Sequence, residues 1–314
     1  MSNNSKMSGK TLGITLAILG GICWGISGVS GSYVFVHYHV TPVWMVNVRL
    51  ILSGLCMLIP LFMKYTIEKK DFFAIWKNKK NIPMLLFFSI MGLGMCQFSY
   101  FSAVELSNAA TATVIQYTAP TFILIYYCIR EKRLPSIKQV ISLVLAMFGV
   151  ALLATKGDFT SLNISQKALM FCMISALTMV VFNVSPVKLM VKYGTAYVVG
   201  WGMLVAGVVM SPFGRPFHFD DSWSWDVNAT IAFAVVILIG TVFAFGLYMA
   251  GVKHAGAETA SMVACIEPLT ATFATVIVMG TKFVWQELLG IGFILLAVVL
   301  LSVKAKKLTD KKYK

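Results

Sequence analysis

Two stretches of this chain read as copies of one structural unit. They are YFSAVELSNAATATVIQYTAP, at Tyr100–Pro120, and YMAGVKHAGAETASMVACIEP, at Tyr248–Pro268. One constant shift in numbering, with no gap, aligns the identical pairs Tyr100/Tyr248, Val104/Val252, Ala109/Ala257, Thr111/Thr259, Ala112/Ala260 and Pro120/Pro268. Extended backwards, the same shift places Gly92 on Gly240. An internal repeat of this kind predicts a fold that is built from two similar halves.

The composition excludes an ordinary soluble domain. Hydrophobic residues make up 58% of the 314 residues and charged residues only 12%, and the mean hydropathy is +0.82. A soluble domain carries about 25% charged residues. The six cysteines lie inside apolar runs without CxxC spacing, so neither a disulfide framework nor a zinc site is expected. We therefore expect an integral membrane protein with no metal and no cofactor.

Ten apolar runs can be marked along the chain, each close to the roughly 20 residues that a helix needs to cross a bilayer. They are Leu12–Val36, Val43–Met63, Pro83–Val104, Ala109–Ile129, Ile137–Thr155, Ala168–Val187, Ala196–Phe213, Ala229–Val252, Ala260–Met279 and Phe283–Val303. Run length favours helices over strands, since a helix satisfies its backbone groups within the segment. The sequence therefore predicts an all-α fold of ten transmembrane helices.

Lysine and arginine are distributed unequally between the two sides that these runs define. All but five of the 26 basic residues lie on the side of the N-terminus. The exceptions are Arg49, inside a run, and Lys156, Lys167, Arg215 and Lys282. Since basic loops stay in the cytoplasm, both termini are predicted to be cytoplasmic, in a plasma or inner membrane. The net charge of +14 is then explained by the membrane topology, and no nucleic-acid partner is expected.

The number of helices in each half decides how the halves are related. The halves span residues 11–155 and 167–303, joined by Lys156–Lys167. Each holds five helices, so the second half enters the membrane from the opposite side and the repeat is inverted. Two such halves can exchange conformations around one central site, which is the basis of alternating access.

Polar side chains recur on one face of the fourth run. Thr113, Gln116, Tyr117 and Pro120 follow helical spacing, and on the third run Gln97 and Tyr100 lie one turn apart. Such a face serves either hydrogen bonding between helices or the lining of a cavity. We assign Thr113 and Ser261 to packing. The candidates for substrate contact are Gln97, Tyr100, Gln116, Tyr117 and Tyr248, with Trp24 from the first run and Asn183 from the sixth.

Pro120 and Pro268 are expected to interrupt the fourth and ninth helices. Each lacks a backbone donor and frees a carbonyl one turn earlier, near Gln116 and Ala264. In lipid such a carbonyl needs a partner, so this backbone should face protein or a water-filled cavity. The alternative is a simple kink that shapes packing.

Two charged residues lie inside the runs. A carboxyl near the middle of the bilayer, such as Glu267, costs about 2.5–3.5 kcal/mol by insertion scales. Burial disfavours its charged form, which suits a proton carrier. The alternative is a protonated acid that hydrogen-bonds to a neighbouring helix. Arg49 can extend outward to water, pair with Glu267 or meet a substrate carboxylate, and we expect it to extend outward.

Other residues of the runs have simpler roles. Gly21 and Gly25 of the first run are expected to allow close helix contact. All four histidines, His37, His39, His218 and His254, lie in loops or at edges, so an intramembrane metal site has no ligands.

From about residue 11 to residue 303, the sequence resembles the EamA family of the drug/metabolite transporter superfamily. The resemblance rests on AVELSNAATATVIQYTAP, on AETASMVACIEP with Glu267–Pro268, and on Arg49, with ILGGICWG, ISLVLAMFGVALL and LLGIGFILLAVVLL in support. It implies two inverted five-helix repeats around a cavity formed by helices 1, 3, 4, 6, 8 and 9. It also implies transport of small metabolites such as amino acids, often outward. The acid that often follows helix nine is absent at Gly280-Thr281-Lys282, although Glu131 remains after helix four.

The function expected from these features is secondary-active export of a small metabolite, with Glu267 as the candidate for proton coupling. The alternative is a passive facilitator in which Glu267 is structural. No GxxxxGK[ST] motif is present, so ATP does not drive the process within this chain. An enzyme would need a nucleophile–base pair or a metal set at one depth, and none is expected. The expected partners are a small-molecule substrate and the bilayer, and the expected state is a monomer or a homodimer.

Overall fold

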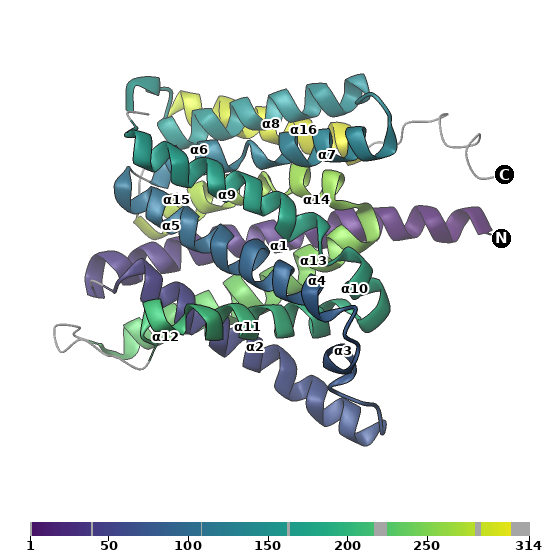
Figure 1. Cartoon of the computed structure of the whole chain (residues 1–314). Coiled ribbons are helices and arrows are strands. Elements are labelled where there is room, and N and C mark those ends of the chain that lie inside the picture. Colours follow the sequence, from purple (N-terminus) through teal and green to yellow (C-terminus); the bar gives the residue numbers. More distant parts are fainter. Residues whose placement is uncertain are drawn as a thin grey trace.

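The computed structural model describes residues 2–38, 40–107, 109–161, 164–216, 225–279 and 284–302. These residues fold into helices, with no strand among them (Figure 1). The helices of the first half are α1 (Ser2–Tyr38), α2 (Pro42–Ile67), α3 (Ala74–Lys77), α4 (Ile82–Phe87), η1 (Phe88–Gly94), α5 (Met95–Leu106), α6 (Ala109–Gln116), α7 (Ala119–Glu131) and α8 (Ile137–Thr155). After η2 (Phe159–Ser161) come α9 (Gln166–Val184), α10 (Val187–Tyr193), α11 (Thr195–Gly214), α12 (Val227–Ile237), η3 (Leu238–Phe243), α13 (Ala244–Ala255), α14 (Ala257–Val263), α15 (Ile266–Met279) and α16 (Trp285–Ser302).

Eight of the helical segments in the described residues are long and apolar enough to cross a membrane. The last expected run appears as a shorter apolar helix, Trp285–Leu301. The ninth expected run is divided between α14 and α15, and neither piece reaches the length of a span. The prediction of an all-helical, multi-span membrane protein is therefore confirmed, while the count of ten spanning helices stays a prediction.

Short polar signals fix where several helices begin. The Ser136 hydroxyl accepts a hydrogen bond from the Gln139 backbone N–H, and the Gln139 side-chain oxygen accepts one from the Ser136 backbone N–H, which forms a capping box at α8. Ser165 and Asp226 accept from the first turns of α9 and α12 in the same way. Between α13 and α14 the chain turns at Gly256, where φ is +85° and a side chain would be strained.

Two pairs of helices are irregular at matching places in the two halves. The third spanning segment contains the π-helical turn η1 and the eighth contains η3, and these turns hold Gly92 and Gly240. The fourth segment breaks between α6 and α7, and the ninth breaks between α14 and α15. Pro120 lies in the first turn of α7 and Pro268 in the first turn of α15. Because π-turns and breaks of this kind cluster at functional sites, they direct attention to these four segments.

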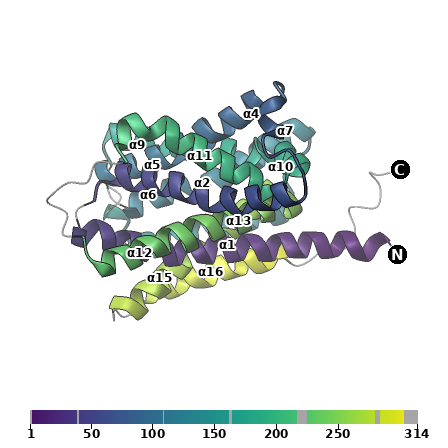
Figure 2. The same ribbon diagram turned by 90° about the horizontal axis from the view of Figure 1, so that it is seen from below.

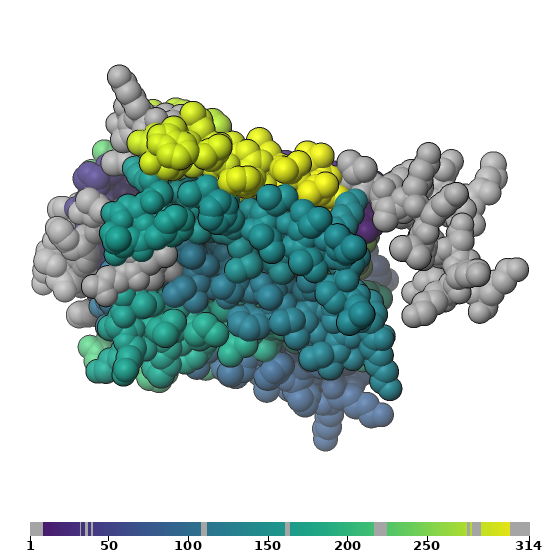
Figure 3. Space-filling view, turned by 90° about the horizontal axis from the view of Figure 1, so that it is seen from above, coloured from purple at the N-terminus to yellow at the C-terminus, as the bar shows by residue number. Residues whose placement is uncertain are grey.

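Four major helix contacts each join one helix of the first half to one helix of the second. Helix α2 packs along α11, and α8 packs along α16; Figure 3 shows α16 in yellow beside teal residues. Helix α5 contacts α9, and α1 contacts α13, which is the same contact with the halves exchanged. In Figure 2, α1 runs through the bundle between α13 and α15. At the α8–α16 contact, a Cβ on Gly149 would lie 2.8 Å from the Gly290 carbonyl oxygen, so the two backbones touch.

The first helix begins, and the last helix ends, at the same end of the bundle. The start of α1 and the end of α16 both lie on the right of Figure 1, and α3 and α10 lie at this end too. The segment between α2 and α4, together with α10, carries seven of the lysines that the topology prediction placed on the side of the N-terminus.

Candidate functional site

The break in the ninth segment meets the break in the fourth. The Tyr117 hydroxyl, just after α6, donates to Glu267 Oε2 of α15 at 2.8 Å. The same hydroxyl lies 3.4 Å from the Ala264 carbonyl oxygen, the group that Pro268 deprives of its usual helical partner. The two interrupted helices, one from each half, are thus joined at their breaks.

Two further hydrogen bonds fix the polar face of the fourth segment. The Tyr100 and Thr113 hydroxyls are 3.0 Å apart, which ties α5 to α6. Gln116 Nε2 donates to Ser175 Oγ of α9 at 2.7 Å and also contacts Cys96 Sγ at 3.9 Å. The Gln116 amide therefore cross-links the two halves, which is the packing role that the sequence left open for this face.

A mostly aromatic group surrounds the eighth segment. The buried Tyr248 hydroxyl donates to Asn183 Oδ1 of α9 at 2.5 Å, and Asn183 Nδ2 donates to the Met179 carbonyl oxygen at 2.8 Å. The indole of Trp24 lies 4.8 Å from the Tyr248 ring and 5.0 Å from the Phe245 ring, centroid to centroid. Asn183, Trp24 and Tyr248 therefore form one packed group, in which the Tyr248 hydroxyl and the Asn183 amide have hydrogen-bond partners.

Arg49 does not extend outward as expected. Its guanidinium carbon lies 5.8 Å from the centroid of the Phe101 ring, and its Nε is buried with no hydrogen-bond partner. The side chain lies close enough to Glu267 and Tyr100 to interact electrostatically with both. The prediction of an outward Arg49 is therefore wrong, because stacking on Phe101 and attraction to Glu267 hold the cation against α5.

Gln97 is the least satisfied of the polar candidates. Its side chain is 7% exposed, and neither Nε2 nor Oε1 has a hydrogen-bond partner. It precedes Phe101 by one turn of α5, so Gln97, Tyr100 and Phe101 share one face of that helix. An orphaned amide at this depth costs free energy, so its retention needs a reason.

Seven of the nine candidate residues fall into two groups. Arg49, Tyr100, Tyr117 and Glu267 lie near one another, and each keeps part of its surface accessible although its contacts are internal. The second group is Trp24, Asn183 and Tyr248. Gly25 of α1 lies against the first group, because a Cβ there would be 2.6 Å from the Glu267 carbonyl oxygen.

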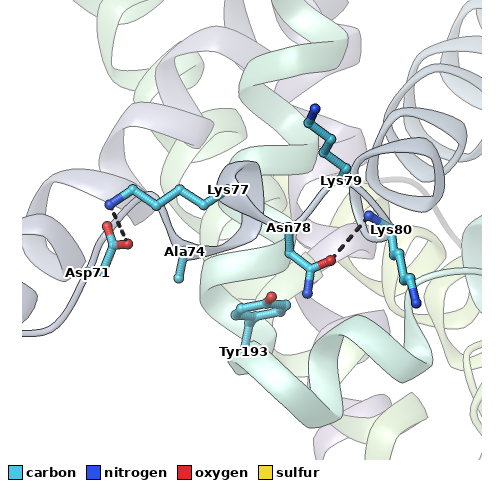
Figure 4. Close-up of a pocket in the computed structure, with 7 residues that line it drawn as sticks. All are labelled: Asp71, Ala74, Lys77, Asn78, Lys79, Lys80 and Tyr193. Atoms are coloured by element: carbon cyan, nitrogen blue, oxygen red, sulfur yellow. Dashed lines mark hydrogen bonds and ion pairs between the residues drawn. The ribbon is translucent and has the colours of Figure 1, made fainter.

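A pocket of about 620 Å³ lies outside this region, at the surface formed by α3, the turn after it and α10 (Figure 4). It is lined by Asp71, Ala74, Lys77, Asn78, Lys79, Lys80 and Tyr193. Lys77 Nζ pairs with Asp71 Oδ2 at 2.7 Å, and this hydrogen bond lowers the pKa of the Asp71 carboxyl. From the sequence these lysines predicted topology only, and the pocket was not predicted.

An ionic network joins the halves at the end of the fourth segment. Arg133 Nε pairs with Glu131 Oε2 at 2.6 Å, and the same guanidinium binds Glu258 at the start of α14. Gln139 Nε2 also donates to Glu258, at 3.4 Å. The repeat places Ala110 and Thr281 opposite Glu258 and Arg133, so the sequence of the other half cannot form this pair.

Sequence reasoning missed three features of this region. Ser175 as the partner of Gln116, Phe101 beneath Arg49 and the π-turns were not predicted. The match of Gly92 to Gly240 was the available signal for the π-turns. Among the described residues, no three His, Cys, Asp or Glu side chains gather as a metal site would require.

Comparison with known proteins places the chain in a family. The profile of the EamA-like transporter family matches residues 11–155 and 166–303. The chain is 32% identical over 303 residues, which are 96% of this chain and 98% of the relative, to an uncharacterized inner membrane transporter, YicL, of Salmonella typhimurium. It is 22% identical to an uncharacterized transporter of Archaeoglobus fulgidus, over 68% of this chain and 76% of that one. A protein of known crystal structure, only 16% identical, has the same fold, with a TM-score of 0.74 and coverage of 93% of this chain and 96% of that one. The chain therefore belongs to the EamA-like transporter family.

Proposed function

We propose that this membrane transporter is a secondary-active exporter of small metabolites such as amino acids, and that it works by alternating access. The observation that carries the proposal is the hydrogen bond between Tyr117 and Glu267, because it joins two interrupted helices from opposite halves. Helix breaks at matching positions of two repeats are the usual place for a transporter's cargo site. Gln97, Tyr100 and Arg49 would complete the cargo contacts.

In this proposal the chain crosses the cell membrane ten times as two inverted repeats, with both termini in the cytoplasm. The proposal assigns the ionic network of Arg133 and Glu258 to closure of the cytoplasmic end. Since the other half lacks that pair, the two ends are held shut by different contacts. The site can then open to one side without the same rearrangement on the other.

Glu267 is the proposed coupling residue. It is the acid among the polar contacts of the two breaks, and Tyr117 offers it a hydrogen bond whether it is charged or neutral. Loss of its proton to one side and gain from the other would link cargo export to the pH gradient.

A passive facilitator is the second candidate, and the same hydrogen bond is the observation that favours it. An acid that Tyr117 satisfies can be a permanent structural link between helices, with no proton exchanged during transport. Cargo would then move only down its own gradient.

Transport assays in proteoliposomes separate these functions. Reconstituted protein is expected to give saturable counterflow of a labelled amino acid without any ion gradient, since a carrier exchanges cargo across its two states. An imposed pH gradient is then expected to drive accumulation of the cargo. Counterflow without pH-driven accumulation would select the facilitator, and flux that neither saturates nor shows counterflow would exclude both carriers.

A further inference from the structure

The contact between α2 and α5 holds polar atoms that the protein itself leaves unsatisfied. Among the described residues, Gln97 is the side chain with both of its polar atoms buried and without partners. Arg49, on the facing helix, has its Nε buried without a partner. No ion pair joins Arg49 to any carboxylate in the described part of the chain, although Glu267 attracts it electrostatically.

Such an arrangement costs free energy in the empty protein. A cation inside a bundle is ordinarily held by a carboxylate or by carbonyl oxygens, and a buried amide ordinarily finds two partners. Here the guanidinium rests on the ring of Phe101, and that contact leaves its N–H groups free to donate. The cost is explained if the missing partner is a group that arrives with the cargo.

The chemistry of that missing group follows from the polar atoms of Arg49 and Gln97 that have no hydrogen-bond partner. The Arg49 guanidinium offers planar N–H donors and a full positive charge, and Gln97 Nε2 offers two more donors. This is the pattern that binds a carboxylate, because its two oxygens accept from a guanidinium in bidentate fashion. Glu267, which interacts electrostatically with Arg49, has carboxylate oxygens that can accept from an ammonium group of the cargo.

We propose that Arg49 and Gln97 form an anion subsite that binds a carboxylate of the cargo, so that the cargo is an organic acid or a zwitterion. The inference rests on the proposed transport function and names the chemical group of the cargo that Arg49 and Gln97 contact.

The test measures thermal stability of the purified protein against matched pairs of probes. The pairs are lactate with lactamide and phenylalanine with phenylalaninamide, at one ionic strength set with sodium chloride. The wild type is expected to be stabilised by the carboxylate of at least one pair and much less by its amide. Arg49→Gln is expected to weaken the apparent affinity for that carboxylate about tenfold or more, until acid and amide act alike.

Gln97→Met is a second variant, which separates a loss of ligand binding from a loss of folding. It replaces an amide that has no partner in the protein by an apolar side chain of similar volume. The ligand-free protein is therefore expected to melt at the same or a higher temperature, while its response to the carboxylate falls. A structural role for Gln97 would instead lower the melting temperature and leave the ligand response intact.

Failure of this inference can be distinguished from failure of the transport function. Equal stabilisation by acid and amide, no stabilisation by any of the acids, or an unchanged response in Arg49→Gln would overturn the subsite, even with counterflow intact. Carboxylate binding that depends on Arg49, in a protein that gives no counterflow, would keep the subsite and remove the transport proposal.

Discussion

Glu267→Gln is expected to abolish cargo accumulation driven by a pH gradient in proteoliposomes, while counterflow without a gradient continues. Glutamine keeps the size of the side chain and still accepts a hydrogen bond from the Tyr117 hydroxyl, so the contact between the two helix breaks survives. What glutamine cannot do is carry a proton. The measurement is uptake of labelled cargo with and without an imposed pH difference.

The matched control is Glu105→Gln, which changes an exposed carboxyl at the end of the third segment. It is expected to leave both kinds of uptake at wild-type levels. If Glu267→Gln accumulated cargo as the wild type does, Glu267 would be a structural acid and the facilitator would be the better description.

Gly25→Ala is expected to destabilise the protein and to reduce transport, whereas Gly28→Ala is expected to do neither. An added methyl at Gly25 would lie 2.6 Å from the Glu267 carbonyl oxygen and 2.8 Å from the Ala271 backbone nitrogen, so α1 must move away from α15. Overpacking of this kind costs about 1–3 kcal/mol. A methyl at Gly28, one turn along the same helix, meets nothing within 4 Å, and alanine favours a helix by about 1 kcal/mol over glycine.

Thermal unfolding in one detergent, together with counterflow, checks this pair. The two variants differ in position alone, so helix propensity cannot explain a difference between them. Equal melting temperatures for Gly25→Ala and Gly28→Ala would contradict the close contact of α1 with the ninth segment and the positioning of Glu267 that follows from it.

The sequence was sufficient to predict the helical membrane fold and the places where helices break. Apolar runs have the length of a span whatever surrounds them, and a proline removes one backbone donor from a helix. The breaks lie next to Pro120 and Pro268 as expected, whereas Pro60 lies inside α2 and Pro212 inside α11, so a proline alone does not decide where a helix breaks. The repeat relation added that two such breaks occur at equivalent places.

The partners of the polar residues could not be predicted in the same way. Whether Gln116 binds Ser175, or Arg49 turns toward Phe101, depends on the distance and rotation between helices that are far apart in sequence. Spacing along one helix gives the shared face of Gln97 and Phe101 but not what that face meets. The pocket lined by surface lysines could not be predicted either. Lysines near a membrane edge predict the orientation of the chain and do not by themselves indicate a binding site.

The central claim is that the face carrying Tyr117 borders a water-accessible cargo path, and cysteine accessibility tests it most directly. In a background without the six native cysteines, Tyr117→Cys and Ile125→Cys would be exposed in proteoliposomes to a membrane-impermeant maleimide during transport. A thiol reacts as its thiolate, which needs water. We predict that the cysteine at position 117 is labelled and that cargo protects it, while the one at position 125, on the exposed apolar face of α7, stays unlabelled. An unlabelled cysteine at position 117, or labelling that cargo does not change, would contradict the account.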